Sequence, residues 1–93
     1  MIGAADIELE MTCGACPEQY WAKHQGRVVG YLRLRHGYFT VNCPDVGGIE
    51  VYEARPLGDG IFYDHEREGY LWKAKQAVAN WVNSVASFQA SAQ

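Results

Sequence analysis

The apolar residues change their spacing once along the chain, and this change limits the folds that the sequence can adopt. Between Asp6 and Met11, acidic and apolar residues alternate strictly, which is typical of a strand with one buried face. From about Asp64 the apolar residues recur every three or four positions, which predicts a helix over about 64–87 with an apolar stripe. The stripe consists of Leu71, Ala74, Val78, Trp81, Val85 and Phe88. The pattern therefore predicts an α+β fold with one C-terminal helix.

The part of the chain before the helix holds further strand signals, all within residues 5–54. Strands are predicted over 19–24, 27–36, 38–43 and 49–54, with tight turns at Gln25-Gly26 and Gly37 and a turn region over 55–63. Because short connections join antiparallel neighbours, we expect a meander of four to five strands packed against the helix. A chain of 93 residues has room for one hydrophobic core, so residues 1–93 are expected to form a single domain.

The period of two also assigns side chains to the two faces of the sheet. Val28, Leu32, Leu34, Phe39 and Val41 are predicted to face the helix. The opposite face is then predicted to carry Trp21, Lys23, Tyr31, Arg33, Arg35, Tyr38, Thr40, Asn42 and Tyr52.

This mixture of aromatic and basic groups is the candidate binding surface. Trp, Tyr and Arg dominate protein–protein hot spots, and rings beside guanidinium groups can also stack bases and hold phosphates. In a third interpretation the face is structural, with Glu8 or Glu10 neutralising Arg33 or Arg35 across the strands.

The charge of the chain favours a protein partner over nucleic acid. The net charge is −3, which excludes a protein whose whole surface is an electrostatic match for nucleic acid. The charges are segregated, however, since residues 1–19 carry four acids and no base, and residues 20–44 carry four bases and no acid. A basic face on an acidic domain is therefore expected.

The termini and the cysteine count favour a cytoplasmic protein with no membrane partner. The uncharged run 76–93 contains too many Asn, Gln and Ser residues to span a bilayer, and the N-terminus lacks the basic start and apolar core of a secretory signal. Three cysteines cannot form a framework of two or three disulfides, so a reducing compartment is expected.

The cysteines allow two kinds of chemistry. Cys13-Gly-Ala-Cys16 followed by Cys43 resembles a degraded zinc ribbon over residues 13–48, in which Val46 stands in place of a fourth cysteine. The resemblance implies a zinc-supported nucleic-acid-binding module with one structural zinc on Cys13, Cys16, Cys43 and His36. With no cofactor, the cysteines would instead be small apolar residues.

The same Cys13-x-x-Cys16 motif also resembles the active site of thioredoxin-like and glutaredoxin-like oxidoreductases. That resemblance implies a small thiol-disulfide oxidoreductase with Cys13 as the nucleophile and Cys16 as the resolving thiol. No other catalytic pattern of Ser, His and acidic residues is present, so the chain is otherwise expected not to be an enzyme.

A last resemblance concerns the run Gly30-Tyr-Leu-Arg-Leu-Arg-His-Gly37 with Gly58-Asp-Gly-Ile-Phe62 downstream. These segments look like those of small uncharacterised bacteriophage and prophage proteins. The resemblance implies a compact accessory protein in the cytoplasm of a bacterial host, which binds a host or phage component and could inhibit a host defence system. The stripe residues Trp81 and Phe88 leave open whether the protein is a monomer or a homodimer.

Overall fold

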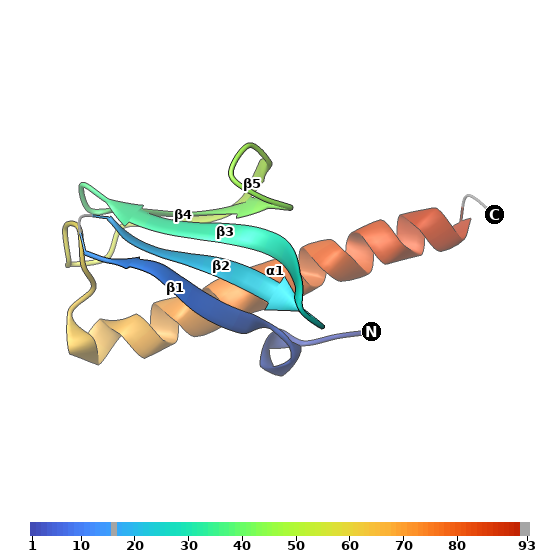
Figure 1. The fold of residues 1–93 in the computed structure, drawn as a ribbon, viewed down its shortest axis with the longest axis horizontal. Coiled ribbons are helices and arrows are strands. Elements are labelled where there is room, and N and C mark those ends of the chain that lie inside the picture. Colours follow the sequence, from blue (N-terminus) through green and yellow to red (C-terminus); the bar gives the residue numbers. More distant parts are fainter. Residues whose placement is uncertain (16, 92–93) are drawn as a thin grey trace.

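Five antiparallel strands form one sheet, and a single long helix crosses one face of it (Figure 1). The structure is a computed structural model that describes residues 1–15 and 17–91, with side chains in these ranges as far as Ala86. The sheet order follows the chain, β1-β2-β3-β4-β5, so the predicted α+β meander with one C-terminal helix is confirmed. The elements are η1 (Ala4–Asp6), β1 (Glu8–Gly14), β2 (Glu18–His24), β3 (Arg27–Arg35), β4 (Tyr38–Cys43), β5 (Ile49–Ala54) and α1 (Asp64–Ser91).

Two tight turns connect the three central strands. Gln25 and Gly26 join β2 to β3 with φ angles of 53° and 79°, and His36 and Gly37 join β3 to β4 with φ angles of 54° and 72°. Two successive positive φ values define the turn whose twist matches that of a hairpin, and glycine adopts such angles without steric cost. Both turns lie where the sequence predicted them.

The hydrophobic core lies between the sheet and α1. Of the predicted stripe, Ala74 and Val78 are buried in the core and Leu71 and Trp81 pack against it half-buried, so this part is confirmed. Ala79 and Val82 join them from the same helix. Trp81 is thus engaged within the chain, and the side chain of Phe88 lies outside the described residues. Within the described residues no helix has the length and apolar character needed to cross a membrane. The fully or nearly buried strand and loop residues are Ile7, Tyr20, Ala22, Leu32, Leu34, Phe39, Val41, Cys43 and Phe62.

The predicted position of Val28 in the core is wrong. Val28 pairs with Lys23 and is 40% exposed, whereas Val29 packs against the core. The pairing of β2 with β3 shifts by one residue between Ala22 and Lys23, and this bulge gives Val29 no partner. One inserted residue reverses the alternation on that side of the bulge, which a strict period of two cannot anticipate.

A glycine allows the helix to approach the sheet closely. A Cβ atom at Gly30 would lie 3.0 Å from Cγ2 of Val78 on α1 and 3.4 Å from Cβ of Ala22 on β2. Gly30 and its register partner Ala22 therefore form a flat patch on which the buried Val78 rests. The small residues at this point set the distance between the two layers.

We predict that Gly30→Ala destabilises the protein by about 1–3 kcal/mol, because an added methyl group overpacks a filled core. Gly3→Ala is the matched control, since no atom lies within 4 Å of a Cβ built there. Urea unfolding of both variants tests this. If overpacking against Val78 is the cause, the double variant Gly30→Ala/Val78→Ala will be less destabilised than the two single effects added together.

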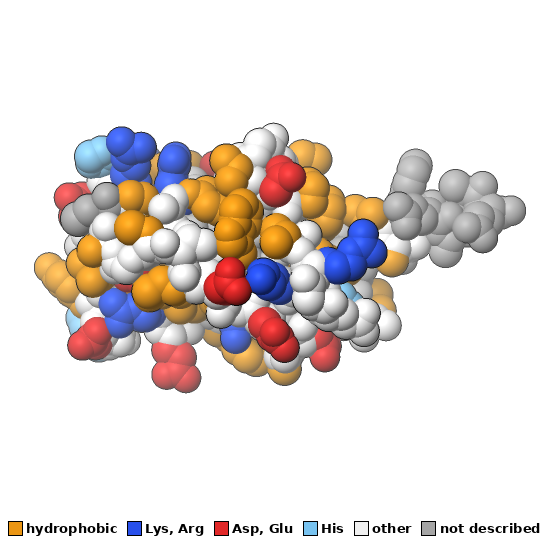
Figure 2. All heavy atoms as spheres, in the orientation of Figure 1, with side chains coloured by type: hydrophobic (Ala, Val, Ile, Leu, Met, Phe, Trp, Pro, Cys, Tyr) orange, Lys and Arg blue, Asp and Glu red, His pale blue; other side chains and the backbone are white. Residues whose placement is uncertain are grey.

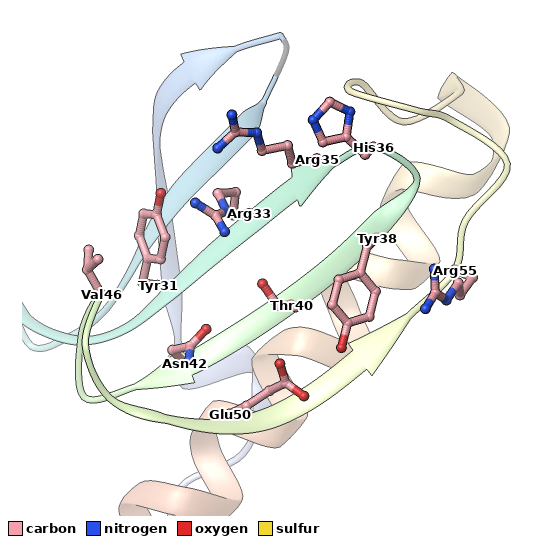
Figure 3. Close-up of a pocket in the computed structure, with 10 residues that line it drawn as sticks. All are labelled: Tyr31, Arg33, Arg35, His36, Tyr38, Thr40, Asn42, Val46, Glu50 and Arg55. Carbon is pink, nitrogen blue, oxygen red and sulfur yellow. The ribbon is translucent and has the colours of Figure 1, made fainter.

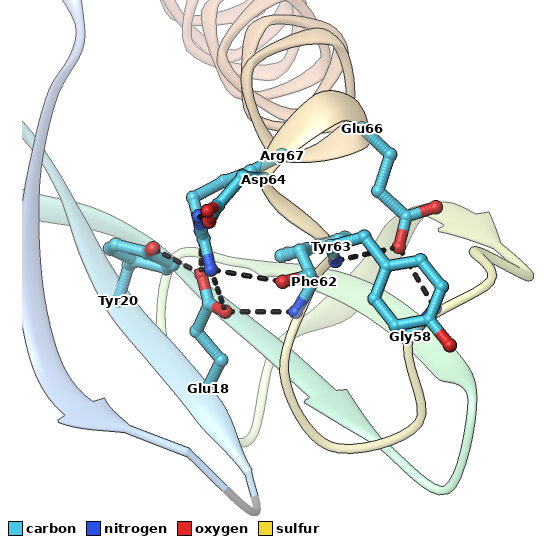
Figure 4. A network of polar contacts seen from close by, with 8 residues as sticks. All are labelled: Glu18, Tyr20, Gly58, Phe62, Tyr63, Asp64, Glu66 and Arg67. Atoms are coloured by element: carbon cyan, nitrogen blue, oxygen red, sulfur yellow. Dashed lines mark hydrogen bonds and ion pairs between the residues drawn. The ribbon is translucent and has the colours of Figure 1, made fainter.

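A buried carboxylate joins the start of β2 to the start of α1 (Figure 4). Glu18 is 0% exposed, and its oxygens accept hydrogen bonds from Nε of Arg67 at 3.0 Å, from the backbone N–H of Phe62 at 3.0 Å and from the hydroxyl of Tyr20. Arg67 in turn donates to the backbone carbonyl of Phe62 at 3.0 Å and to Asp64 at 2.7 Å. Every polar atom of this buried carboxylate therefore has a partner.

The same network perturbs the groups around Glu18. Burial, followed by the hydrogen bond to Glu18, raises the pKa of Tyr20 well above its usual value. Hydrogen bonds to Glu18 and Asp64 raise the pKa of Arg67, so the guanidinium stays charged. The carboxylate is thus matched by a permanent positive charge.

The segment 55–63 between β5 and α1 is fixed to the sheet and to the helix. Its carbonyl groups at Asp59 and Gly60 accept hydrogen bonds from the N–H groups of Gly37 (2.6 Å) and Glu18 (2.9 Å). On the helix side Glu66 accepts hydrogen bonds from the N–H groups of Leu57, Gly58 and Tyr63 at 2.8–3.0 Å. Desolvation opposes ionisation of Glu66, but these N–H groups outweigh it and lower the pKa.

We predict that Glu18→Gln lowers the free energy of unfolding by about 3–5 kcal/mol, because it leaves the charge of Arg67 without its buried partner. Asp64→Asn removes the other carboxylate bound to Arg67, but Asp64 is exposed, and its loss should cost less than about 1 kcal/mol. Denaturant unfolding of both variants measures the difference, and equal losses would contradict a dominant role of Glu18.

Candidate functional site

The face of the sheet opposite α1, here called the outer face, carries most of the residues predicted to bind a partner. Strand register places Trp21, Tyr31 and Asn42 in one row across β2, β3 and β4. Arg33 and Thr40 pair in the next row, and Arg35 and Tyr38 pair beyond them. Lys23 lies on the same face of β2 as Trp21, two residues along. The structure thus brings together eight of the nine side chains that the sequence assigned to this face.

Tyr52 is the exception, and its predicted position on the outer face is wrong. It pairs with Val41, which faces the helix, and its ring packs edge-on against Phe39 with ring centroids 6.1 Å apart. The pairing of β4 with β5 shifts by one residue between Val41 and Asn42. This bulge turns Tyr52 to the helix side and leaves Glu50 and Glu53 on the outer face.

The middle of the outer face is hollowed (Figure 3). The depression has a volume of about 730 Å³ and lies mainly over β3 and β4. Its rim is formed by β5, the β3–β4 turn, the β4–β5 loop and the segment after β5. Figure 2 shows basic side chains beside a histidine at the end of the molecule where β3 turns into β4. The lining residues are Tyr31, Arg33, Arg35, His36, Tyr38, Thr40, Asn42, Val46, Glu50 and Arg55.

Two arginines on β3 supply charge that the described part of the chain leaves uncompensated. Arg33 and Arg35 are exposed, and neither forms an ion pair with any residue in the described ranges. The expectation that Glu8 or Glu10 neutralises them is wrong, because Glu10 pairs with Lys23 at 3.0 Å. Because Arg33 and Arg35 are two residues apart on β3, their guanidinium groups project from the same face of the sheet, toward the depression (Figure 3).

Aromatic rings border the arginines on both sides. The rings of Trp21 and Tyr31 lie 5.3 Å apart with a tilt of 54°, and the hydroxyl of Tyr31 donates to the side chain of Gln19. This pair is held by packing and by a hydrogen bond, so it offers a contact surface that is already ordered. Large, rigid aromatic area of this kind supports binding at low entropic cost.

Tyr38 anchors the other side of the depression. Its hydroxyl donates to Glu53, and the guanidinium carbon of Arg55 lies 4.6 Å from the centre of its ring. The hydrogen bond to Glu53, with some desolvation, raises the pKa of Tyr38 to about 12, while the same bond lowers the pKa of Glu53. Desolvation and the neighbouring Glu53 raise the pKa of Glu50. The carboxylates on β5 are thus partly satisfied by their neighbours, unlike the arginines on β3.

Four residues that line the depression were not predicted from the sequence to bind a partner. Arg55 was assigned to a turn region, His36 to a zinc site, and Val46 and Glu50 to no site. A basic residue directly after the last strand was the available signal for Arg55. The face of the sheet on which Glu50 lies depends on the bulge in the β4–β5 pairing, and the alternation of apolar and polar residues does not reveal where that bulge is.

The proposed zinc ligands are not all brought together. His36 lies in the turn that precedes β4, and Cys43 is at the far end of that strand, whose length from Tyr38 to Cys43 is about 16 Å at 3.3 Å per residue. Cys13 pairs with Gln19, near the end of the sheet that carries His36, and Cys16 lies outside the described residues. Among residues 1–15 and 17–91 no group of three His, Cys, Asp or Glu side chains is placed to hold a metal ion.

The thiol chemistry of the two described cysteines differs. Cys13 is the next-to-last residue of the strand β1, whereas the thioredoxin-like motif requires a cysteine at a helix N-terminus to stabilise the thiolate. Cys43 is fully buried in the core, and burial raises its pKa to about 12 from 9.0. The folded state therefore holds Cys43 as a neutral thiol.

We predict that iodoacetamide at pH 8 alkylates the half-exposed Cys13 in the folded protein and leaves Cys43 unmodified. Because the pKa of Cys43 is raised in the folded state, the stability that the neutral thiol contributes is fully present below about pH 9 and is lost as the pH rises toward 12, where the unfolded chain ionises first. Mass spectrometry of peptides from folded and denatured protein measures both sites. Alkylation of Cys43 at equal rates in the two states would show that it is not buried.

Comparison with family models, with curated proteins and with solved structures gave no match for this chain.

Proposed function

We propose that this protein is a small non-enzymatic binding module that engages a protein partner through the outer face of its sheet. The observation that carries the proposal is the pair of exposed arginines, Arg33 and Arg35, beside the ordered rings of Trp21 and Tyr31. Trp, Tyr and Arg are the residues that contribute most to protein–protein affinity, and they do so at the centre of an interface. The depression lined by Tyr31, Arg33 and Arg35 can receive a side chain of the partner.

The charges on the face favour an acidic segment of a protein over a nucleic acid. Arg33 and Arg35 need counter-charges, and a carboxylate can accept two parallel hydrogen bonds from one guanidinium group. Glu50 and Glu53 lie on the same face and would repel the continuous phosphate backbone of a nucleic acid. A protein segment can place its carboxylates over β3 and leave β5 to polar or basic residues.

The resemblance to bacteriophage and prophage proteins supports a site of action in the bacterial cytoplasm. The run 30–37 that carries this resemblance includes Tyr31, Arg33 and Arg35 on the outer face. The partner would then be a host or phage protein, and a host defence component is one candidate.

We predict that the double variant Arg33→Glu/Arg35→Glu stays folded and loses its partner in affinity capture from a bacterial lysate. Both side chains are exposed, so stability should change by less than about 1 kcal/mol, whereas removing an arginine that is a binding hot spot weakens binding by about 2 kcal/mol or more.

The matched control is Arg27→Glu/Lys73→Glu, which makes the same change in net charge at exposed positions outside the depression. Retention of the partner by the control and its loss from the outer-face variant support the proposal. Unchanged capture by Arg33→Glu/Arg35→Glu refutes it, and loss of the captured material after nuclease treatment would assign the face to nucleic acid instead.

A further inference from the structure

The edge strand β1 lies beside an apolar groove, and we propose that the two together dock an extended segment of a partner protein in which basic and apolar residues alternate. The segment would add to the sheet as a sixth strand. The groove shares no lining residue with the depression on the outer face, so this proposal does not depend on the function proposed for that depression.

The backbone of β1 is open to such an addition. Within the described sheet β1 pairs only with β2, so its other edge presents N–H and C=O groups that can template a further strand. Edge strands are usually protected by charged side chains (Lys above all), by Pro, by a bulge or by a covering element. In β1 the charges are those of Glu8 and Glu10, which disfavour pairing with an acidic strand but not with a basic one. Residues 8–14 contain neither Lys nor Pro, and α1 packs mainly on η1, β3, β4 and β5. The bulge between Met11 and Cys13 limits regular pairing to residues 8–11.

The groove receives the side chains that an added strand would direct toward the helix. It has a volume of about 460 Å³ and runs between β1 and the first half of α1, whose first turns lie beyond the β1 edge in Figure 1. Leu9 lines it from the strand, and Leu71 and Trp72 line it from the helix. Trp72 is 48% exposed, and Met11, on the same side of β1 as Leu9, is 52% exposed. Because strand side chains alternate, every second residue of the added strand would contact this apolar surface.

The charges around β1 specify the other residues of the segment. Glu8 and Glu10 are exposed on the outer side of β1, where Glu8 lies opposite Lys23 and Glu10 opposite Trp21 in the register with β2. Lys23 forms an ion pair with Glu10 at 3.0 Å, so Glu8 has no ionic partner among the described residues. Asp64 and Glu68 add negative charge to the lining of the groove. Of the two basic residues in that lining, Arg67 is already paired with Glu18, which leaves Lys75. Basic residues that alternate with the apolar ones would lie beside Glu8 and Glu10 and form favourable cross-strand pairs.

The same charges argue against a second copy of the chain as the occupant. If β1 paired with β1 of another copy in antiparallel fashion, Glu8 or Glu10 would lie opposite or diagonal to a glutamate of that copy. Like charges placed in this way are destabilising. A heterologous basic and apolar strand is therefore the better match.

The probe is a capped seven-residue peptide in which Lys and Val alternate, and the readout is the NMR spectrum of the whole protein. We expect saturable shifts at the amides of residues 8–11 and at the indole N–H of Trp72. A peptide of equal composition with its lysines and valines in separate blocks should bind at least about tenfold more weakly, because it cannot place one kind of residue on each side. N-methylation of alternate peptide nitrogens that face β1 should abolish the shifts.

Two variants test the groove and its charge. Trp72→Ala should weaken binding of the alternating peptide about tenfold, while Leu57→Ala, which truncates another exposed apolar side chain, should leave it unchanged. Glu8→Gln/Glu10→Gln should weaken binding about threefold at low salt and have little effect at 1 M salt.

Equal binding of the blocked peptide would overturn the proposal, since simple charge attraction would then account for the result. So would shifts confined to Trp21 and Tyr31, which would move binding to the outer face. A dimeric mass in light scattering that Trp72→Ala abolishes would also overturn it, because the occupant would then be a second copy.

Discussion

The buried carboxylate of Glu18 determines how the two layers of the protein meet. It binds Arg67 and the backbone of Phe62, which lie 49 and 44 positions further along the chain, and so fixes the start of α1 against the start of β2. With that end fixed and Val78 resting on Gly30, the helix can only cross the sheet diagonally. Its first turns then project beyond β1 and form the groove, while the outer face is left without a covering helix. Both candidate binding surfaces follow from this one arrangement.

The two surfaces differ in charge, which the net charge of −3 conceals. The outer face presents Arg33 and Arg35 without ionic partners in the described part of the chain, beside an ordered aromatic pair. The edge strand presents Glu8 and Glu10 above an apolar groove. A module of this design could hold an acidic segment and a basic strand at the same time, because the depression lies over β3 and β4 whereas the groove lies beside β1 on the helix side.

The periodicity of the sequence predicted the elements and most of the outer face, because side-chain alternation follows directly from strand geometry. It failed at Val28 and Tyr52, where a bulge inserts one residue and exchanges the two faces. Glu18 could not be recognised either, since it belongs to an acidic block that is typical of an exposed surface, and its partner Arg67 is remote in sequence. Pairing register and burial are tertiary properties, so the rim residue Glu50, whose face depends on the bulge in the β4–β5 pairing, was also outside the reach of local patterns.

The meander topology has a consequence for the order of folding. Each strand pairs with its neighbour in sequence, and two of the hairpins close through turns of two residues, so the sheet can form from local contacts with little loss of loop entropy. The contacts of α1 with the start of β2 require closure of a far longer loop. The sheet is therefore expected to assemble first and the helix to dock late. During synthesis the apolar face of the sheet would then stay exposed to water until α1 has been made.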